Sequence, residues 1–488
     1  MRPAYTAAQV RALEAAAMRT VGDDALMQRA AYGLAVVAAA ELRRRYGRVH
    51  GCRVLVLVGP GNNGGDALFA GARLARRGVS VVAVRALGQP HAGGRAALLE
   101  AGGRLADLDA FDADQHRPAA DADPEIDLVI DGVLGIGGRP GLPGPVADLA
   151  RQLREWHVPV LAVDLPSGTD TDTGAAPPDS FRAARTVTFG VRKPCHLLEP
   201  SVSRCGPVDL VDIGLDLGLE PPALAAWDID DLALAWLFPD EGSDKYSRGV
   251  VAIDSGSNDY PGASILNTYG AVHAGAGMVR FLGPAAAATV ILAQLPNVVF
   301  TPGRVQVHLL GSGWGERADG AAAVAAAVDT GLPVLVDADG LRHLPERLPP
   351  TCLLTPHAGE LARLLDCPRA DVEADPMAAV RAGANRTGAT VLLKGATQLV
   401  CTPGAVTIGV ALPGSAWTAQ AGSGDTLAGS CAALLAAGRS AAEAALLGAS
   451  LQAASAASAP GPLPPHVLAQ RGAEELGRLQ HRRLELAR

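Results

Sequence analysis

The sequence predicts an α/β protein of two domains, each built around a largely parallel β-sheet. Short apolar runs rich in Val, Ile and Leu recur without polar alternation, and helical patterns separate several of them. This arrangement is typical of strands that are buried on both faces. The chain has 488 residues, of which 49% are hydrophobic and 19% charged, so it can bury two large cores.

The first half of the chain shows this rhythm most clearly. Residues 7–46 predict two Ala-rich helices that are broken near Gly22. Strands are predicted at residues 52–58, 79–84, 126–130, 158–163 and 186–189. The rhythm stops near Asp212, and residues 213–243 carry the Gly and Pro residues of a domain boundary. We therefore predict an N-terminal domain over residues 1–216, a linker over 217–223 and a C-terminal domain over 224–488.

A second α/β series follows the boundary. Its strands are predicted at residues 250–254, 305–310, 334–336, 352–355 and 390–393. The tail after Thr426 is Ala-rich and predicts helices. The two halves share no sequence period, which favours two different α/β domains over a duplication.

Composition excludes several classes of function. The formal net charge of −8 and the isoelectric point near 5.8 argue against a nucleic-acid coat or a polybasic membrane face. No apolar run approaches the roughly 20 residues that a bilayer requires, and Arg11, Glu14 and Arg19 do not fit a signal peptide. The seven scattered cysteines form no C-x-x-C pair, which argues against disulfides or structural zinc. We expect a cytoplasmic protein.

Residues 59–66, GPGNNGGD, follow the first predicted strand and open a helix. They contain the G-x-G-x-x-G pattern, but the next strand ends at Arg85 and not at an acid that could hold a ribose. Asp66 in the first helical turn would also repel a pyrophosphate. Two interpretations remain: a glycine turn with Asp66 as helix cap, or a strand-end pocket in which Asn62 and Asn63 supply amide groups.

Two further predicted strands end in aspartates. Asp131 leads into a glycine-rich loop, and Asp164 leads into a Pro-Ser-Gly turn that contains Ser167. Because the carboxyl ends of parallel strands line one crevice, Asn63, Asp131, Asp164 and Ser167 are expected to converge. Their oxygens suit a cation such as K⁺ or a poised acid/base. For each aspartate taken alone, helix capping is the alternative.

The segments GPGNNGGD, DGVLGIG, VDLPSGTDTDTG and TFGVRKP resemble, in this order, the NAD(P)H-hydrate epimerase domain over roughly residues 5–215. The resemblance implies a Rossmann-like three-layer αβα fold, with Asp164 as acid/base at C6 of the damaged nicotinamide ring. It implies that Asn63, Asp131 and Ser167 hold potassium. It also implies that the hydrate is bound by Asn62, Asn63, Gly64, Gly65, Asp66, Gly135, Ile136, Gly137, Gly138, Arg139, Pro140, Gly141 and Asp164.

Two residues in this half need separate comment. Ala67 stands where the family usually has Gly, and its methyl group is expected to narrow the pocket. Lys193, one of only three lysines in the chain, falls within TFGVRKP. Its alternative interpretation is a solvated lysine on a loop.

Residues 421–429, AGSGDTLAG, precede a long helix in the second half. Their glycines expose backbone N–H groups at a helix N-terminus, which favours anion binding. Asp425 is placed to accept a proton from a hydroxyl that attacks a phosphoryl group, with helix capping as the alternative. Lys394 follows a predicted strand and is placed to neutralise nucleotide phosphates. His357 follows another, and either a structural or a ligand-binding role fits it.

The segments DKYSRGVVAIDSGSNDYPGA, GSGWG, VDADGL, LTPHAGE, KGATQ and AGSGDTLAG resemble the ADP-dependent NAD(P)H-hydrate dehydratase, a ribokinase-like enzyme, over roughly residues 224–485. The resemblance implies hydrate contacts at Ala263, at Gly313 or Gly315, at His357 and at Asp425. It implies nucleotide contacts at Lys394, Gly395, Ala396, Thr397, Gln398 and Gly424. The match departs beside Lys245, where Asp244 and Tyr246 replace the usual His and Gly.

Together the resemblances imply a bifunctional enzyme that repairs hydrated NADH and NADPH. It would interconvert the R and S epimers at C6 with K⁺, and dehydrate the S epimer at the expense of ADP and Mg²⁺, releasing AMP and phosphate. We expect a homo-oligomer with no nucleic-acid or membrane partner. One alternative is a ribokinase-like small-molecule kinase with a non-catalytic N-terminal domain, and another is a non-catalytic scaffold or RNA-associated module.

Overall fold

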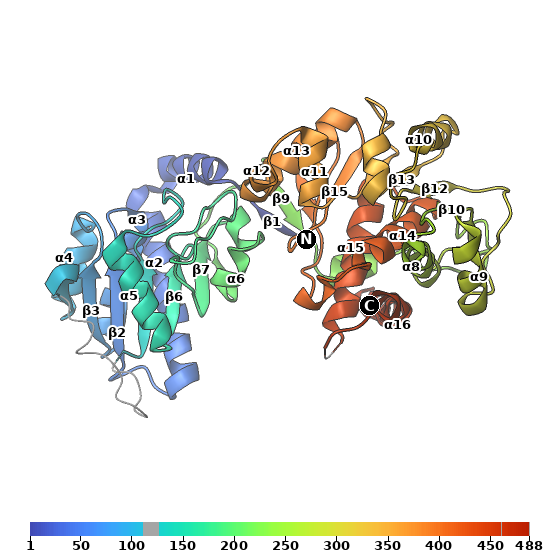
Figure 1. Cartoon of the computed structure of the whole chain (residues 1–488). Coiled ribbons are helices and arrows are strands. Elements are labelled where there is room, and N and C mark those ends of the chain that lie inside the picture. The colour runs from blue at the N-terminus through green and yellow to red at the C-terminus, as the bar shows by residue number, and fades with distance from the viewer. Residues whose placement is uncertain (111–125, 460, 488) are drawn as a thin grey trace. The chain divides into compact units, whose positions relative to one another are not determined.

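The computed structural model describes residues 1–110, 126–459 and 461–487 (Figure 1). They form two compact units, which we describe separately. One comprises Pro3–Ala223, and the other begins at Leu224 and also includes Met1–Arg2. Each unit is a β-sheet flanked by helices, so the predicted α/β class is confirmed. The division between the units falls at the end of the segment expected to be the linker.

The N-terminal unit contains a seven-stranded sheet in the order β4-β3-β2-β5-β6-β7-β8, and all its strands run parallel. Its strands are β2 (Arg53–Val58), β3 (Ser80–Arg85), β4 (Arg104–Asp107), β5 (Leu128–Gly132), β6 (Val160–Val163), β7 (Arg185–Phe189) and β8 (Val208–Val211). The five central strands match the predicted runs. The edge strands β4 and β8 were not predicted, because their residues are only partly buried and lack a continuous apolar run.

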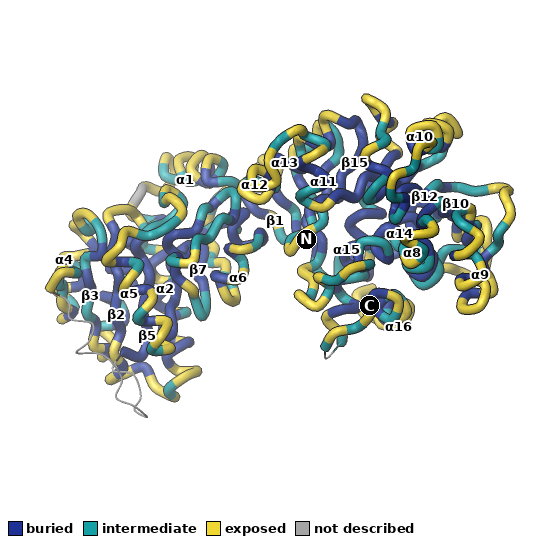
Figure 2. The backbone as a smooth tube through the Cα atoms, viewed as in Figure 1, coloured by how far each residue is buried: buried dark blue, intermediate teal, exposed yellow. Residues whose placement is uncertain are grey.

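Helices cover both faces of this sheet. They are α1 (Ala7–Val21), α2 (Asp23–Tyr46), α3 (Asn62–Ala75), α4 (Ala92–Glu100), α5 (Gly144–Glu155) and α6 (Val202–Cys205). Leu34 of α2 and Leu68 of α3 share one core with Val56, whereas Val146 of α5 shares the opposite core with Leu57. Figure 2 shows the buried strands between helices whose outer faces are exposed. This is the three-layer arrangement that the sequence predicts.

The turn between β2 and α3 lies against the loop after β5 at very close range. A Cβ atom placed on Gly59 would lie 1.8 Å from the Val133 carbonyl oxygen, and one on Gly64 would lie 2.2 Å from the Gly59 carbonyl oxygen. Only glycine permits these backbone contacts. They bring the N-terminus of α3 to the ends of the central strands.

The second unit contains a ten-stranded mixed sheet in the order β1-β9-β17-β16-β15-β14-β13-β12-β10-β11. Its strands are β1 (Arg2–Ala4), β9 (Leu224–Ala226), β10 (Val250–Asp254), β11 (Met278–Phe281), β12 (Val307–Leu310), β13 (Val334–Val336), β14 (Leu353–Leu354), β15 (Thr390–Leu393), β16 (Leu399–Cys401) and β17 (Ile408–Val410). The strands from β11 to β15 are parallel, and β16 is antiparallel to both of its neighbours. All five predicted strands are present. The others were missed because they are short and two of them lie in a local antiparallel meander.

The helices of this unit include the predicted Ala-rich tail. They are α7 (Ile229–Ala235), α8 (Pro261–His273), α9 (Ala285–Gln294), α10 (Gly320–Asp329), η4 (Ala338–His343), α11 (Ala358–Leu365), α12 (Arg369–Ala374), α13 (Pro376–Thr387), α14 (Ser423–Ala436), α15 (Ala441–Ala457) and α16 (Pro465–Leu486). Helices α8 and α14 are in backbone contact, since a Cβ on Gly270 would lie 2.0 Å from the Thr426 carbonyl oxygen. Among the described residues, no helix is both long and apolar enough to cross a bilayer.

The close turn after β2 gives a stability prediction. Gly59→Ala should lower the free energy of unfolding of the N-terminal unit by about 1–3 kcal/mol, because its methyl group collides with a fixed carbonyl. Gly61→Ala is the matched control, since a Cβ there meets nothing within 4 Å and its φ of −93° suits alanine. Urea unfolding of both full-length variants measures the difference. Equal stability of the two variants would contradict this explanation of the turn.

Candidate active sites

A cavity of about 320 Å³ lies in the N-terminal unit beside the N-terminus of α3 and the ends of β6 and β7. Part of its wall is apolar and includes Met18, Met27, Phe189 and Ile213. Polar side chains also line the cavity, namely Asn62, Asn63, Asp66 and Asp164. The glycine-rich loop contributes Ile136. Side chains from three of the predicted segments therefore meet in one ligand-sized space.

Asp164 lies in this cavity with a strained backbone and with one carboxylate oxygen held by hydrogen bonds. Its φ of +67° is uncommon for a residue with a side chain and is typical of functional sites. Its Oδ1 accepts hydrogen bonds from Lys193 Nζ at 2.5 Å and from Thr188 Oγ1 at 2.9 Å. Lys193 is 1% exposed and also donates to Thr188 Oγ1 at 2.9 Å. The interpretation of Lys193 as a solvated loop lysine is therefore wrong.

His196 fixes the backbone of the same pair. Its Nδ1 accepts a hydrogen bond from the Lys193 backbone N–H at 3.1 Å, so its Nε2 donates to the Asp164 carbonyl oxygen at 2.8 Å. Burial, together with the charge of Lys193, lowers the pKa of His196 to about 4 and keeps the ring neutral. Sequence reasoning missed His196. The available signal was its position three residues after Lys193, where a side chain can cap the turn.

Asp66 is a second carboxyl group in the cavity and does not cap a helix. The N-cap of α3 is Gly61, and no side-chain capping bond is present, so the capping alternative for Asp66 is wrong. Asp66 is 6% exposed, and its Oδ1 has no hydrogen-bond partner. Burial raises the pKa of Asp66 well above its usual value, and the charges of Asp164 and Glu14 raise it further. These effects favour the protonated form of the Asp66 carboxyl.

Asn63, Asp131 and Ser167 come together behind the cavity as predicted. Ser167 donates to Asp131 through its hydroxyl at 2.6 Å and through its backbone N–H at 2.8 Å. Asn63 Nδ2 donates to the carbonyl oxygens of Leu134 at 3.1 Å and Val163 at 2.7 Å. Burial raises the pKa of Asp131 to about 6, although the bonds from Ser167 oppose the shift. The group is a buried cluster of oxygen atoms linked by short bonds.

The glycine-rich loop closes over this cluster. A Cβ on Gly135 would lie 2.5 Å from Asn63 Oδ1, and the Gly138 N–H donates to the Gly135 carbonyl at 2.7 Å. Arg139 and Pro140 are exposed on the same loop. Ala67 is fully buried against Gly132 and lies outside the cavity wall, so the expected narrowing of the pocket is wrong.

The second unit gathers its predicted residues at the carboxyl ends of β12 to β15. Asp337 follows β13, is 1% exposed, and accepts hydrogen bonds from Ser312 Oγ at 2.9 Å and Thr355 Oγ1 at 2.7 Å. Lys394 Nζ bonds the same carboxylate at 2.6 Å. Burial alone lowers the pKa of Lys394, but the charges of Asp337 and of other acidic groups nearby raise it above its usual value. Lys394 therefore remains a cation.

Asp425 lies in the first turn of α14, close to this cation. A Cβ on Gly424 would lie 3.1 Å from Lys394 Nζ, so the lysine reaches the N-terminus of that helix. Asn267 Nδ2 holds the Asp425 backbone by donating to its carbonyl oxygen at 2.8 Å. Burial raises the pKa of Asp425 to about 7 and Asp337 adds to the shift, whereas Lys394 opposes it. Such a carboxyl group can exchange protons near neutrality.

The structure gives contacts for some of the other residues that were predicted for this site. His357 Nδ1 accepts from the Gly359 backbone N–H at 3.0 Å and caps α11, while its ring is 52% exposed. A Cβ on Gly313 would lie 2.6 Å from the Ala263 Cβ, so these two residues are in contact. The loop between β15 and β16 carries residues 395–398, and Gln398 Oε1 is buried without a hydrogen-bond partner.

Both units match described families. Residues 251–475 match the family model described as NAD(P)H-hydrate dehydratase, and residues 23–195 match that of the YjeF-related protein N-terminus. The bifunctional NAD(P)H-hydrate repair enzyme Nnr of Mycobacterium tuberculosis is 44% identical over 91% of each chain. Nnr of Corynebacterium glutamicum is 33% identical over 88% of this chain and 86% of its own. An ADP/ATP-dependent NAD(P)H-hydrate dehydratase structure from Bacillus subtilis aligns with a TM-score of 0.49 and 22% identity, over 54% of this chain and 100% of its own.

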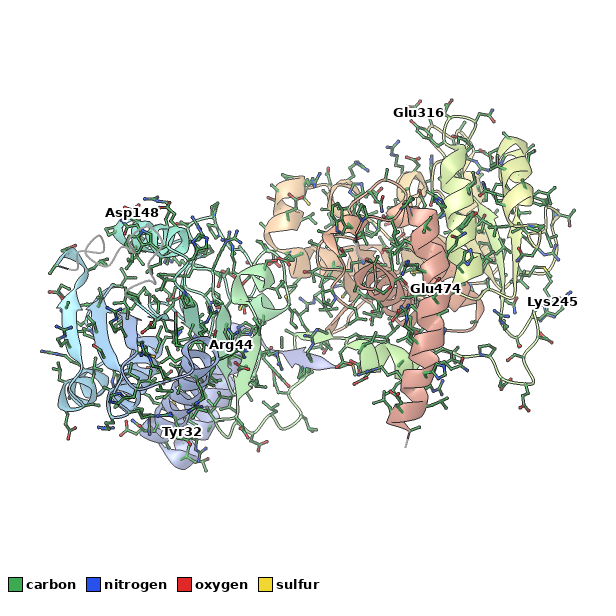
Figure 3. All side chains as sticks on the ribbon, turned by 90° about the horizontal axis from the view of Figure 1, so that it is seen from below. Tyr32, Arg44, Asp148, Lys245, Glu316 and Glu474 are labelled. Carbon is green, nitrogen blue, oxygen red and sulfur yellow. The ribbon has the colours of Figure 1, made fainter. Side chains whose placement is uncertain are left out.

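The buried ion pair gives a second stability prediction. Lys193→Met should destabilise the N-terminal unit by about 3–5 kcal/mol, because it leaves the buried Asp164 carboxylate without its cation. Adding Asp164→Asn should restore part of this loss, since Asn tolerates positive φ and removes the orphaned charge. Lys245→Met is the control, because Lys245 is an exposed lysine on the loop before β10 (Figure 3). If the changes in unfolding free energy of Lys193→Met and Asp164→Asn simply add in the double variant, the two residues are not coupled.

Proposed function

The chain belongs to the family of bifunctional NAD(P)H-hydrate repair enzymes, and on that premise we propose which residues carry its two reactions. It repairs hydrated NADH and NADPH: one unit epimerises the hydrate at C6, and the other dehydrates the S epimer. One observation supports the assignment most strongly. Each unit presents an aspartate beside a lysine at the carboxyl edge of its sheet: Asp164 with the buried Lys193, and Asp425 with the partly buried Lys394.

Asp164 is the acid/base of the epimerase. Lys193 and Thr188 hold one carboxylate oxygen, so proton transfer at C6 falls to the other oxygen, Oδ2. His196 and the positive φ of Asp164 fix the carboxylate direction without supplying a proton. In the proposed route the C6–O bond breaks and re-forms on the opposite face of the ring, and a positioned carboxylate can accept a proton from the incoming water.

The cavity accounts for recognition of the damaged ring. Its apolar wall, with Met18, Met27 and Phe189, can pack on the reduced nicotinamide, while Asn62 can hydrogen-bond the carboxamide. The glycine-rich loop can hold the rest of the dinucleotide through its backbone N–H groups. The full set of residues proposed to bind the hydrate here is Asn62, Asn63, Gly64, Gly65, Asp66, Gly135, Ile136, Gly137, Gly138, Arg139, Pro140, Gly141 and Asp164.

Asn63, Asp131 and Ser167 are the proposed potassium ligands. The fit rests on chemistry: the cluster offers hard oxygen donors, and Asp131 is fully buried with no cationic side chain bonded to it. A buried carboxylate of this kind is stable when a cation neutralises it. When bound, potassium supplies that charge. Asn63 and Ser167 already fix the loop at Leu134, two residues before Ile136, which lines the cavity.

The second unit dehydrates the S epimer by phosphorylation. Asp425 accepts the proton of the C6 hydroxyl as that oxygen bonds the terminal phosphorus of ADP and AMP departs. Loss of the new phosphate, with a proton from the neighbouring ring carbon, restores the double bond. Lys394 and the N-terminus of α14 face the charge that develops on the phosphoryl group. Mg²⁺, which binds largely through substrate phosphates, supplies further positive charge there.

The other residues proposed to contact the hydrate and the nucleotide lie in the same unit as Asp425 and Lys394. Ala263, Gly313, Gly315, His357 and Asp425 are the proposed hydrate contacts. Lys394, Gly395, Ala396, Thr397, Gln398 and Gly424 are the proposed nucleotide contacts. The buried, unpaired Oε1 of Gln398 is an acceptor of the kind that an adenine amino group requires. We place the enzyme in the cytoplasm, where its seven free cysteines would stay reduced.

Matched variants test the division of labour. Asp164→Asn should slow interconversion of the hydrate epimers by at least about 100-fold and leave dehydration of the S epimer at the wild-type rate. Asp425→Asn should do the reverse. Epimers are separated chromatographically, and dehydration is followed by the absorbance of reduced nicotinamide and by free phosphate. A stable phosphoester product, or loss of both activities in either variant, would show that the assignment is wrong.

The pKa of Asp425 predicts a pH dependence. As a base, Asp425 must be deprotonated, so dehydration at saturating ADP should rise with pH through about 7 and then level off. The rate should fall about tenfold for each pH unit below that value. Initial rates over two pH units on either side of neutrality measure the profile. Asp339→Asn is the control, because this carboxylate lies nearby but bonds the Gly315 N–H, and its profile should keep an acid limb.

A further inference from the structure

The cavity of the N-terminal unit holds more carboxyl groups than the proposed role of Asp164 requires. Besides Asp164, its wall includes Asp66 from α3 and Glu14 from α1. Asp66 is 6% exposed with an unpaired Oδ1, which is costly unless a ligand or a reaction uses that atom. Glu14 has no part in the mechanism above, and Asp66 appears there only as a contact to the hydrate.

Epimerisation by loss and return of water imposes a geometric requirement. The hydroxyl leaves from one face of C6 and water returns to the other, so the departing oxygen and the incoming oxygen lie on opposite sides of the ring. One carboxylate cannot touch both. A group that donates a proton on one face and a group that accepts a proton on the other are both needed.

Asp66 has the properties of the donor. Its Oδ1 is buried and unpaired, its burial and the neighbouring charges of Asp164 and Glu14 favour the protonated form, and it lies on a different element from Asp164. Asp164 is held by Lys193 in the opposite state, as a carboxylate. Two carboxyl groups with opposed protonation in one cavity are the arrangement expected of an acid and base that act together.

Glu14 reaches the same cavity from α1, which is tied to the rest of the site. Arg11 Nη2 donates to the Ile136 carbonyl at 3.0 Å, and the Ala7 N–H donates to Asp172 Oδ1 at 2.7 Å. Burial raises the pKa of Glu14 and the charge of Asp164 adds to this, whereas Lys193 and Arg11 lower it. Glu14 therefore interacts electrostatically with both Asp164 and Asp66 and lines the same cavity.

We propose that Asp66 and Glu14 form a second proton-transfer pair in the epimerase cavity, so that C6 is epimerised between carboxyl groups that come from separate elements of the fold. The proposal rests on the epimerase function proposed above and assigns Glu14 a role that the motifs do not suggest. Asp66 acts on the face opposite to Asp164, and Glu14 exchanges protons with Asp66.

The proposed steps balance without a further reactant. Asp66 protonates the departing hydroxyl, which leaves as water while the lone pair of ring N1 forms a C6=N1 double bond. A second water bonds C6 from the other face, the C6=N1 electrons return to N1, and Asp164 takes the proton. Glu14 gives Asp66 a proton, and the proton on Asp164 passes back to Glu14 through cavity water. One water leaves, one enters, and no redox change occurs.

Two other titratable side chains line the cavity. His91 Nδ1 accepts from the Gly94 backbone N–H at 3.1 Å and caps α4, so that nitrogen is already used. Asp24 lies in the first turn of α2. His91→Gln and Asp24→Asn therefore report whether the pH dependence belongs to these groups and not to Asp66 and Glu14.

The test follows conversion of the S hydrate to the R hydrate by the full-length protein in H₂¹⁸O without ADP. We expect one ¹⁸O at C6 for each epimerisation in the wild type. Asp66→Asn should slow the reaction by about 100-fold or more, and Glu14→Gln by about tenfold. Glu14→Asp should recover part of the loss. The wild-type rate should decline at high pH, as Asp66 loses its proton, and Asp66→Asn should lack this decline.

Two internal controls separate the outcomes. Dehydration of the S epimer by the other unit should be unchanged in each variant, which reports that the chain is folded, and the exposed Glu155→Gln variant should match the wild type. Wild-type rates and pH profiles in both Glu14→Gln and Asp66→Asn would overturn the proposal while leaving the epimerase function intact. Absence of ¹⁸O incorporation during rapid wild-type epimerisation would overturn the water-exchange route. No wild-type epimerisation beyond the spontaneous rate would overturn the epimerase function itself.

Discussion

The carboxyl edge of each sheet is assembled by backbone contacts that only glycine permits. In the N-terminal unit Gly59 lies against the Val133 carbonyl, and in the other unit Gly270 lies against the Thr426 carbonyl. A side chain at Gly59 would force the two loops apart, and one at Gly270 would force helices α8 and α14 apart. Because the loops touch, Asn63 can reach carbonyl groups that follow two different strands, at 3.1 Å and 2.7 Å. The polar clusters at both edges depend on this close fit.

Burial of charge is the second common feature of the two units. Lys193 with Asp164 and Lys394 with Asp337 are pairs in which at least one partner is almost fully buried. A buried pair of this kind contributes little to stability in itself, because desolvation offsets the attraction. Its effect is to place fixed charges beside the neighbouring titratable groups. Two further carboxyl groups, Asp66 and Asp425, lie close to these pairs. Burial raises their pKa, the aspartate of the pair adds to the shift, and the lysine opposes it.

The lysine–aspartate pairs of the two units differ in which aspartate the lysine bonds. In the N-terminal unit the lysine bonds the proposed acid/base Asp164 directly, while burial raises the pKa of the neighbouring Asp66. In the other unit the lysine bonds Asp337 and lies beside Gly424, which leaves Asp425 free to titrate near neutrality. The first arrangement suits proton transfer on two faces of a ring. The second suits a single deprotonation next to a phosphoryl group.

The sequence by itself determined the class of fold, the central strands and the order of the motifs, because continuous apolar runs and glycine turns are local signals. It also placed Asn63, Asp131 and Ser167 together, since parallel strands end at one edge. The partly buried edge strands β4 and β8 left no such pattern. Burial of Lys193, the tautomer of His196 and the approach of Glu14 to the cavity join segments that lie far apart in the chain. Only the tertiary structure decided them, because desolvation and the distance between charges arise when those segments pack together.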